Sequence, residues 1–293
     1  MTDAAPLPPV HLYQIAYSQA TLAQIEPGYH FIDNLQNPRP DWYEYWPIRR
    51  HLLAETLDEN AFYGFFSPKF IQKTGLSHAR VTAFVQRHAA STDVCLFSPQ
   101  ADMGAFFLNV FEQGETFDPG LIEAFSAFLQ SVGRAGPELR GMVMDSRQIV
   151  FSNYFVARPA FWREWLALNE QLFAACEGPD TPLKRMLTPP TTYPGDAQRK
   201  VFLMERVASY LLFTQPHWRT QAANTFEFLW SETSLRNARS EAIVSDALKT
   251  AFREQGFPQY LKEFAAVRER FRANARAQAQ AEAAAQATPE VTP

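Results

Sequence analysis

Residues 63–75 read YGFFSPKFIQKTG, and this stretch decides the fold that we predict. An aromatic run that begins at Phe62 stops at Ser67, and two lysines, Lys69 and Lys73, follow at once. Aromatic residues favour a buried strand, and polar residues at its end indicate that the chain leaves the sheet there. Ligands of open α/β sheets bind at the carboxyl ends of the strands. The stretch therefore predicts an enzyme-like α/β domain.

Composition limits the class of protein. Of the 293 residues, 46% are hydrophobic and 14% aromatic, which is enough for one large core or two small ones. A net charge of −4 gives no global basic field, so we expect no nucleic-acid partner. The two cysteines, Cys95 and Cys176, are too few for a disulfide framework or a cysteine zinc site. They fit a reducing compartment.

The sequence also bears on where the protein resides. No apolar run reaches the roughly 20 residues that span a bilayer. The acidic, proline-rich residues 1–9 are unlike a signal peptide. We expect a cytoplasmic protein without a transmembrane segment, and peripheral association with a membrane stays open.

Strand-like and helix-like patterns alternate over the first 175 residues, and helix-like patterns dominate afterwards. This alternation favours a mainly parallel sheet with helices on both faces. Strands are expected at residues 10–17, 29–32, 62–66, 93–97 and 148–157, and residues 105–111 are either a strand or a helical turn. Helices are expected at residues 42–57, from Ser77, from Asp118 as an N-cap, from Pro159, and at residues 199–213, 240–254 and 258 to about 275.

The same patterns predict the domain organisation. Residues 1–9 form a flexible arm, and residues 10–215 form the α/β domain. Residues 216–272 form a helical C-terminal extension packed on that domain, and the Ala/Gln-rich residues 273–293 form a fraying or disordered tail. The proline-rich residues 178–195 form a connection long enough to be a functional lid.

The first candidate for chemistry is the pair Lys69 and Lys73. If the turn after Pro68 is helical, the two ammonium groups lie four residues apart on one face. Two such groups at the end of a strand would suit a diphosphate. The alternative interpretation is a solvated basic surface.

The second candidate is an acidic stretch, residues 109–120, which reads NVFEQGETFDPG. Together with Asn109, its acids Glu112, Glu115 and Asp118 could supply a general base, acceptors for sugar hydroxyls or a metal site. Asp118 has a simpler interpretation as a helix cap.

Several polar residues lie in apolar surroundings. One of Arg49 and Arg50 is expected to point inward, where it needs a phosphate or a carboxylate such as Asp41 or Glu44. The third candidate region, residues 144–153, places Asp145 before an expected strand and the pair Ser152-Asn153 inside it. A polar pair in an apolar strand needs backbone partners or a ligand. Glu205 and Arg206, in an apolar helix, are interpreted as an internal ion pair.

Common catalytic motifs are absent from the sequence. It has no P-loop, no G-x-G-x-x-G fingerprint and no G-x-S-x-G nucleophile elbow. The six histidines show no metal-binding spacing. These absences remove most common classes of α/β enzyme.

The order of motifs resembles a group of bacterial glycosyltransferase-like proteins that accompany surface-polysaccharide genes. The resemblance covers roughly residues 10–215, and the organisation is similar to the GT-A superfamily of nucleotide-sugar glycosyltransferases. It rests on the segments HLYQIAYS, DWYEYWPIRRHL, YGFFSPKFIQKTG, DVCLFSP, NVFEQGE, FSNYFVARPAFWREWL and RKVFLMERVASYLL. The resemblance implies a GT-A-like, Rossmann-like sheet and a nucleotide-sugar donor as co-substrate.

The resemblance also implies roles for particular residues. The exit of the first strand would hold the nucleotide base, at Gln14, Ala16, Tyr17 and Ser18. A following helix would supply Arg49 or Arg50. A late strand would face the acceptor through Ser152, Asn153 and Tyr154.

One departure from the GT-A pattern matters. No Asp-x-Asp motif, which usually holds a divalent metal against the diphosphate, occurs in this chain. A divalent metal is therefore doubtful, and Lys69, Lys73 or an arginine must neutralise any diphosphate in its place. A CMP-linked sugar, with one phosphate, would need less neutralisation. The departure also leaves room for an inactive relative.

The sequence thus predicts a glycosyltransferase that moves a sugar from a nucleotide sugar to a glycan or another acceptor, in surface-polysaccharide synthesis. Two alternatives remain: a non-catalytic carbohydrate- or protein-binding module, and a different transferase or hydrolase of a phosphorylated small molecule. The predicted site comprises acceptor-side acids (Glu112, Glu115, Asp145), donor-binding residues (Gln14, Tyr17, Ser18, Arg49, Arg50, Ser67, Lys69, Lys73) and acceptor-binding residues (Asn109, Ser152, Asn153, Tyr154), with no metal ligands.

Overall fold

The protein is a mixed α/β structure built on one six-stranded sheet. The computed structural model describes residues 6–134 and 136–287. The strands lie in the order β2-β1-β3-β5-β4-β6, and all run parallel except β5, which is antiparallel to β3 and β4. Their bounds are β1 Val10–Ala16, β2 His30–Asp33, β3 Phe62–Phe66, β4 Val94–Leu96, β5 Phe155–Ala157 and β6 Thr220–Ala222. The predicted mainly parallel sheet is confirmed.

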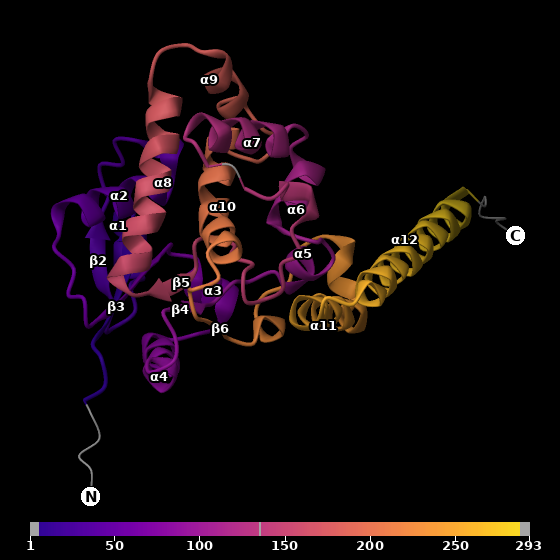
Figure 1. Cartoon of the computed structure of the whole chain (residues 1–293), viewed down its shortest axis with the longest axis horizontal. Helices are drawn as coiled ribbons and strands as arrows, with labels where there is room; N and C mark the ends of the chain where they lie inside the picture. Colours follow the sequence, from indigo (N-terminus) through magenta and orange to yellow (C-terminus); the bar gives the residue numbers. More distant parts are fainter. Residues whose placement is uncertain (1–5, 135, 288–293) are drawn as a thin grey trace, which may run out of the picture.

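Helices cover both faces of the sheet (Figure 1). The larger core lies between one face and α2, α8 and α10, with Trp42, Trp162 and Trp165 fully buried in it. A smaller core lies between the other face and α3 and α4. The helix bounds are α1 Gln19–Ala23, α2 Tyr45–Ala54, α3 Phe70–Thr74, α4 His78–His88, α5 Ala101–Ala105, α6 Val110–Phe117, α7 Leu121–Ser131, α8 Pro159–Glu177, α9 Pro182–Leu187, α10 Arg199–Thr214, α11 Arg239–Gln255 and α12 Pro258–Ala287.

The aromatic strand β3 is central to the sheet, as its sequence predicts. All five of its residues are buried, because β1 and β5 flank it and both cores contact it. Gly64 is required there, since a Cβ at this position would lie 2.8 Å from Cγ2 of Val156 on β5. The glycine therefore permits the close pairing of β3 with β5.

Three expectations about secondary structure are wrong. Residues 148–157 are not one strand; only Phe155–Ala157 pairs, because Ser152 and Asn153 form a left-handed turn before it. The proline-rich segment 178–195 is not an irregular loop throughout, since it contains α9. The helix expected at residues 42–57 is shorter, since α2 begins only at Tyr45, after the 3-10 helix Pro40–Trp42, and ends at Ala54.

The expected boundary after residue 215 does not coincide with a structural boundary. Strand β6 follows it and pairs with β4 in the main sheet. Beyond β6, α11 docks on α5 through Lys249, whose buried ammonium donates to the carbonyl oxygens of Gly104 and Phe107 at 2.7 and 2.8 Å. Helix α12 projects away from the sheet (Figure 1).

The ends of the chain complete the description. The predicted tail is helical as far as Ala287, where α12 ends. Most of the predicted N-terminal arm, residues 1–5, lies outside the described residues, as do residues 288–293. In the part of the chain that the structure describes, no helix has the length and apolar character needed to cross a membrane.

Candidate functional site

The strand order places a switch point between β1 and β3. The chain leaves β1 to form β2 on one side, and later forms β3 on the other side of β1. The loops after β1 and β3 therefore run in opposite directions, and sheets of this type bind ligands where that happens. Tyr17 directly follows β1, and Ser67 directly follows β3.

Side chains from five segments meet at this point, and we name them the switch-point cluster. Its members are Tyr17, Glu44, Ser67, Lys73, Ser152, Tyr154 and Glu205. Lys73 Nζ on α3 donates to Ser152 Oγ at 3.0 Å and lies 5.6 Å from the centroid of the Tyr154 ring. The hydroxyl oxygens of Ser67 and Tyr154 are 2.6 Å apart. Five of the residues predicted from the sequence, Tyr17, Ser67, Lys73, Ser152 and Tyr154, are thus brought together.

Unusual backbone conformations surround the switch-point cluster. Ser152 and Asn153 have φ values of 59° and 53°, and Tyr43, beside Glu44, has a φ of 45°. Non-glycine residues rarely adopt positive φ, and such strain persists where neighbouring contacts hold it, often at functional sites. Here the turn brings Ser152 to Lys73 and directs the Asn153 amide to Met204 Sδ at 3.3 Å.

Glu44 and Glu205 are the acids of the switch-point cluster. Both side chains keep partial solvent exposure although protein atoms surround their carboxylates. Burial raises the pKa of Glu205 to about 7, and the charge of Glu44 adds to the rise, while Arg206 and Lys73 oppose it. Burial also raises the pKa of Glu44. Its own backbone N–H and the positive charges of Lys73 and Lys69 lower that pKa, but by less than burial raises it. An acid with a pKa near neutrality can exchange protons at the working pH of most enzymes.

Glu205 does not form the predicted ion pair with Arg206. The Arg206 guanidinium instead donates to the carbonyl oxygens of Val110 and Phe202 and to Gln113 Oε1, at 2.7–2.9 Å. Burial lowers the pKa of Arg206 to about 10. Among the residues that the structure describes, neither Glu44 nor Glu205 has an ion-pair partner. Glu205 is therefore a carboxylate whose charge no described ion pair neutralises.

Two further polar atoms of this region lack partners. The hydroxyl of Tyr17 and Oδ1 of Asn153 are buried and make no hydrogen bond to any described residue. Burial, with the charges of Glu44 and Tyr154, raises the pKa of Tyr17 well above its usual value, so this hydroxyl stays protonated and can donate. Buried polar groups are normally satisfied. These two atoms are exceptions to that rule, and both lie at or beside the switch-point cluster.

Other predicted donor-binding residues have structural contacts. Gln14 is buried, and its side chain accepts from the Glu26 backbone N–H at 3.3 Å. Ser18 caps α1, and Lys69 is exposed just before α3. Arg49 points inward as expected, but it pairs with Glu170 on α8, at 2.5 and 2.8 Å, and not with Asp41 or Glu44.

The predicted acceptor-side acids also have partners. Glu112 pairs with Arg268 at 2.8 Å. Glu115 accepts from the backbone N–H groups of Gly120 and Ile122, which is the capping role expected of Asp118. Asp118 instead pairs with Arg199 at 2.7 Å.

Two more predicted residues are fully committed to the interior. Asp145 is 0% exposed and binds Arg147 at 2.7 Å and Arg253 at 3.3 Å. Asn109 caps α6 and donates to the carbonyl oxygens of Leu139 and Met142. Because these contacts use their polar atoms, the geometry favours Glu44 and Glu205 over the predicted acids as reactive groups.

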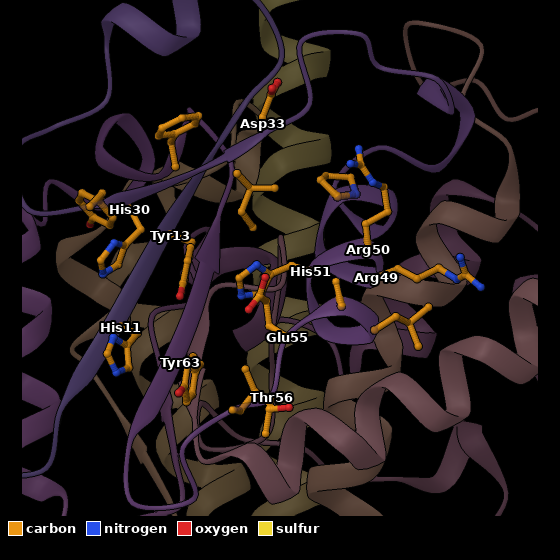
Figure 2. Close-up of a pocket in the computed structure, with 17 residues that line it drawn as sticks. His11, Tyr13, His30, Asp33, Arg49, Arg50, His51, Glu55, Thr56 and Tyr63 are labelled. Carbon is orange, nitrogen blue, oxygen red and sulfur yellow. The ribbon is translucent and has the colours of Figure 1, made fainter.

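A separate groove opens on the sheet face beside α2, and we name it the histidine groove. Its volume is about 1000 Å³, and its main residues are His11, Tyr13, His30, Arg50, His51 and Glu55 (Figure 2). Arg50, one of the predicted donor-binding residues, lies here and not at the switch-point cluster. Arg49, its neighbour, also lines the groove, but its guanidinium is directed to Glu170, and Figure 2 shows its side chain extending away from His51 and Glu55.

No metal site emerges from the described residues. Within residues 6–134 and 136–287, no three His, Cys, Asp or Glu side chains come close enough together to hold a metal ion. The Asp-x-Asp motif is absent as well. The residues of the switch-point cluster thus do not fit the metal that GT-A enzymes usually carry.

The sequence interpretation missed Glu44 and Glu205 as site residues. A signal existed for Glu205, which stands alone as an acid in the apolar helix RKVFLMERVASYLL. The chain matches no protein-family model, no curated protein and no solved structure.

Proposed function

We propose that the protein is a glycosyltransferase of GT-A-like fold that moves a sugar from a nucleotide sugar to a hydroxyl acceptor. The observation that carries this proposal is that Glu205, a carboxylate without an ion-pair partner among the described residues, lies in the same cluster as the cation Lys73, whose charge acts on it. Glycosyl transfer needs both groups, a base for the acceptor and positive charge for the leaving phosphate. The motif order of the sequence supports the same assignment.

Glu205 is the proposed base. Its carboxylate takes the proton from the acceptor hydroxyl as that oxygen forms a bond to the anomeric carbon of the sugar. The bond between the anomeric carbon and the phosphate oxygen breaks, and the electron pair leaves with the nucleotide. A pKa of about 7 suits the group to take the proton at neutral pH and to release it afterwards.

Lys73 is the proposed electrostatic partner of the leaving phosphate. Its ammonium group lies at the end of β3, where Ser152 holds it. Lys69, exposed one helical turn earlier, is proposed to meet a second phosphate. No three metal-ligating side chains come together among the described residues, and we assign the stabilisation of the leaving charge to these lysines.

The test combines binding with turnover. Thermal unfolding is measured with UDP-, GDP- and CMP-linked sugars, with and without Mn²⁺, and nucleotide release is followed in parallel. At least one nucleotide sugar should raise the melting temperature and be turned over. Glu205→Gln should keep the thermal shift and lose turnover by about 100-fold or more, as for removal of a general base, while Lys73→Ala should weaken both. Two variants at exposed positions, Glu232→Gln and Lys262→Ala, are the matched controls.

The outcomes separate the proposal from its alternatives. No thermal shift from any nucleotide sugar would contradict it. Binding without turnover, unchanged by Glu205→Gln, would favour a non-catalytic binding module. Binding of simple phosphate esters without preference for a nucleotide would favour a different transferase or hydrolase.

A further inference from the structure

The histidine groove has a floor of aromatic rings. His11 and Tyr13 on β1, His30 on β2 and Tyr63 on β3 project from the same sheet face, since register pairs Tyr13 with His30 and His11 with Tyr63. The ring centroids of these two pairs are 5.1 and 5.0 Å apart. His51 on α2 closes the row, 4.5 Å from Tyr13 (Figure 2). The result is a row of rings, stacked on or tilted against one another, that spans three strands and one helix; we name it the ring surface.

The ring surface is accessible to a ligand. His11, Tyr13 and His51 are half-buried and His30 is exposed, whereas Tyr63 is buried beneath them. The groove volume of about 1000 Å³ lies at the upper end of the range of about 300–1,000 Å³ that is typical of small-ligand sites. The groove can therefore accept a molecule of several rings.

Free polar groups surround the ring surface. Among the described residues, the side chains of Arg50 and Glu55 make no ion pair and no hydrogen bond, and Nε2 of His51 is buried without a partner. Asp33 adds a second exposed carboxylate at one end of the groove. The rim thus offers both donors and acceptors.

From this combination we infer that the histidine groove binds a neutral oligosaccharide. A sugar presents hydroxyls, which both donate and accept hydrogen bonds and suit the rim groups and the polar atoms of the rings. Its C–H groups can pack against the edges of the rings and against the exposed His30. An anionic ligand fits less well, because two carboxylates face one free guanidinium. Burial lowers the pKa of His11 and His51, so these rings are neutral at pH 7.

The groove is distinct from the switch-point cluster. Helix α2 links them: Glu44 stands at its start, and His51 follows seven residues later, which is about 10 Å along a helix axis. Binding in the groove is separate from the proposed transfer reaction and can be measured without turnover.

The histidines themselves provide the readout. The chain has six, of which His11, His30 and His51 line the groove, whereas His88 on α4 and His217 after α10 do not. The intact protein, labelled with ¹³C in its histidine rings, is titrated separately with maltohexaose, cellohexaose and chitohexaose. At least one sugar should shift the ring signals of the three groove histidines in a saturable way and leave those of His88 and His217 unchanged.

Variants assign the binding to the groove. His30→Ala and Glu55→Gln, both at exposed positions, should each weaken binding about tenfold, which is the loss of about 1.4 kcal/mol. His217→Ala is the matched control and should bind as the wild type does. Lys73→Ala should also bind normally, so a failure of the transferase proposal leaves this result intact.

Three results would overturn the inference. One is the absence of any shift of the groove histidines with all three sugars at 10 mM. Another is a shift that includes His88 and His217 equally. A third is a shift of the groove histidines that depends on protein concentration alone, since the exposed Phe31 and Leu53 nearby would then be contacting a second copy of the chain.

Discussion

Two regions of the molecule contain half-buried acids, and they differ in whether those acids have partners. In the acidic stretch, Glu112 pairs with Arg268, and Asp118 pairs with Arg199. In the switch-point cluster, Glu44 and Glu205 have no such partner among the described residues, and burial raises the pKa of both. Pairing, and not local density of acids, therefore separates a structural carboxylate from a candidate reactive one.

The largest expected effect concerns a paired acid of the interior. Asp145→Ala leaves Arg147 and Arg253 without their buried carboxylate and should lower the free energy of unfolding by about 3 kcal/mol. Urea unfolding at pH 7 measures the change. The control is Asp180→Ala, which removes an exposed ion pair with Arg185 and should change stability by less than about 1 kcal/mol. An equal decrease in the free energy of unfolding in the two variants would show that burying the ion pairs of Asp145 does not increase their contribution to stability.

Glu205→Gln should raise the free energy of unfolding, and the size of this increase should depend on pH. The pKa of Glu205 is raised on folding, so the native state binds more protons than the unfolded state between pH about 4.5 and 7, and stability falls as pH rises through that window. Removing the charge should stabilise the protein by about 1.5 kcal/mol at pH 8, after allowance for solvent screening. At pH 4.5 the variant and the wild type should be nearly equal. Urea unfolding at the two pH values tests this, and a variant less stable than wild type at pH 8 would indicate a hidden partner of Glu205.

The sequence predicted the sheet well for a physical reason. The apolar and aromatic residues of β1, β3 and β4 are enough by themselves to predict buried strands, and the polar residues that follow them mark the ends of these strands. That reasoning placed Ser67 at the end of the strand and Lys73 shortly after it, whereas the switch point itself became visible only from the strand order. Local chemistry also identified the helix start at Ser77. The cap at Asn109 was not recognised, and that residue was assigned a ligand-binding role.

The pairing of the acids could not be predicted in this way. Glu112 and Arg268 are 156 residues apart in the chain, and Asp118 and Arg199 are 81 apart. Only tertiary structure brings these charges together. The same long-range packing isolates Glu205 from Arg206, its neighbour in sequence, because Arg206 turns to Gln113 and the Val110 carbonyl on α6. The sequence analysis consequently interpreted the acidic stretch as a site and gave Glu44 and Glu205 structural roles as partners of arginines.

The smallest expected effect concerns the backbone conformation of Ser152 in the switch-point cluster. Ser152 holds a φ of 59°, which glycine adopts without strain and alanine does not. Ser152→Gly should therefore be more stable than Ser152→Ala by about 1 kcal/mol, although both lose the hydrogen bond from Lys73. Thermal unfolding of the two variants side by side gives the difference. If alanine were as stable as glycine, the turn would not be held in the left-handed conformation.

The central claim, that Glu205 is an unpaired acid poised near neutrality beside Glu44, is tested most directly by ¹³C NMR of the glutamate side-chain carboxyls. Glu205→Gln assigns the signal by its disappearance. We predict a titration midpoint of about 7 for Glu205, and a lower midpoint in Glu44→Gln, because removal of that charge removes repulsion. A midpoint near 4.5, the ordinary value for a glutamate, unmoved by Glu44→Gln, would contradict the account.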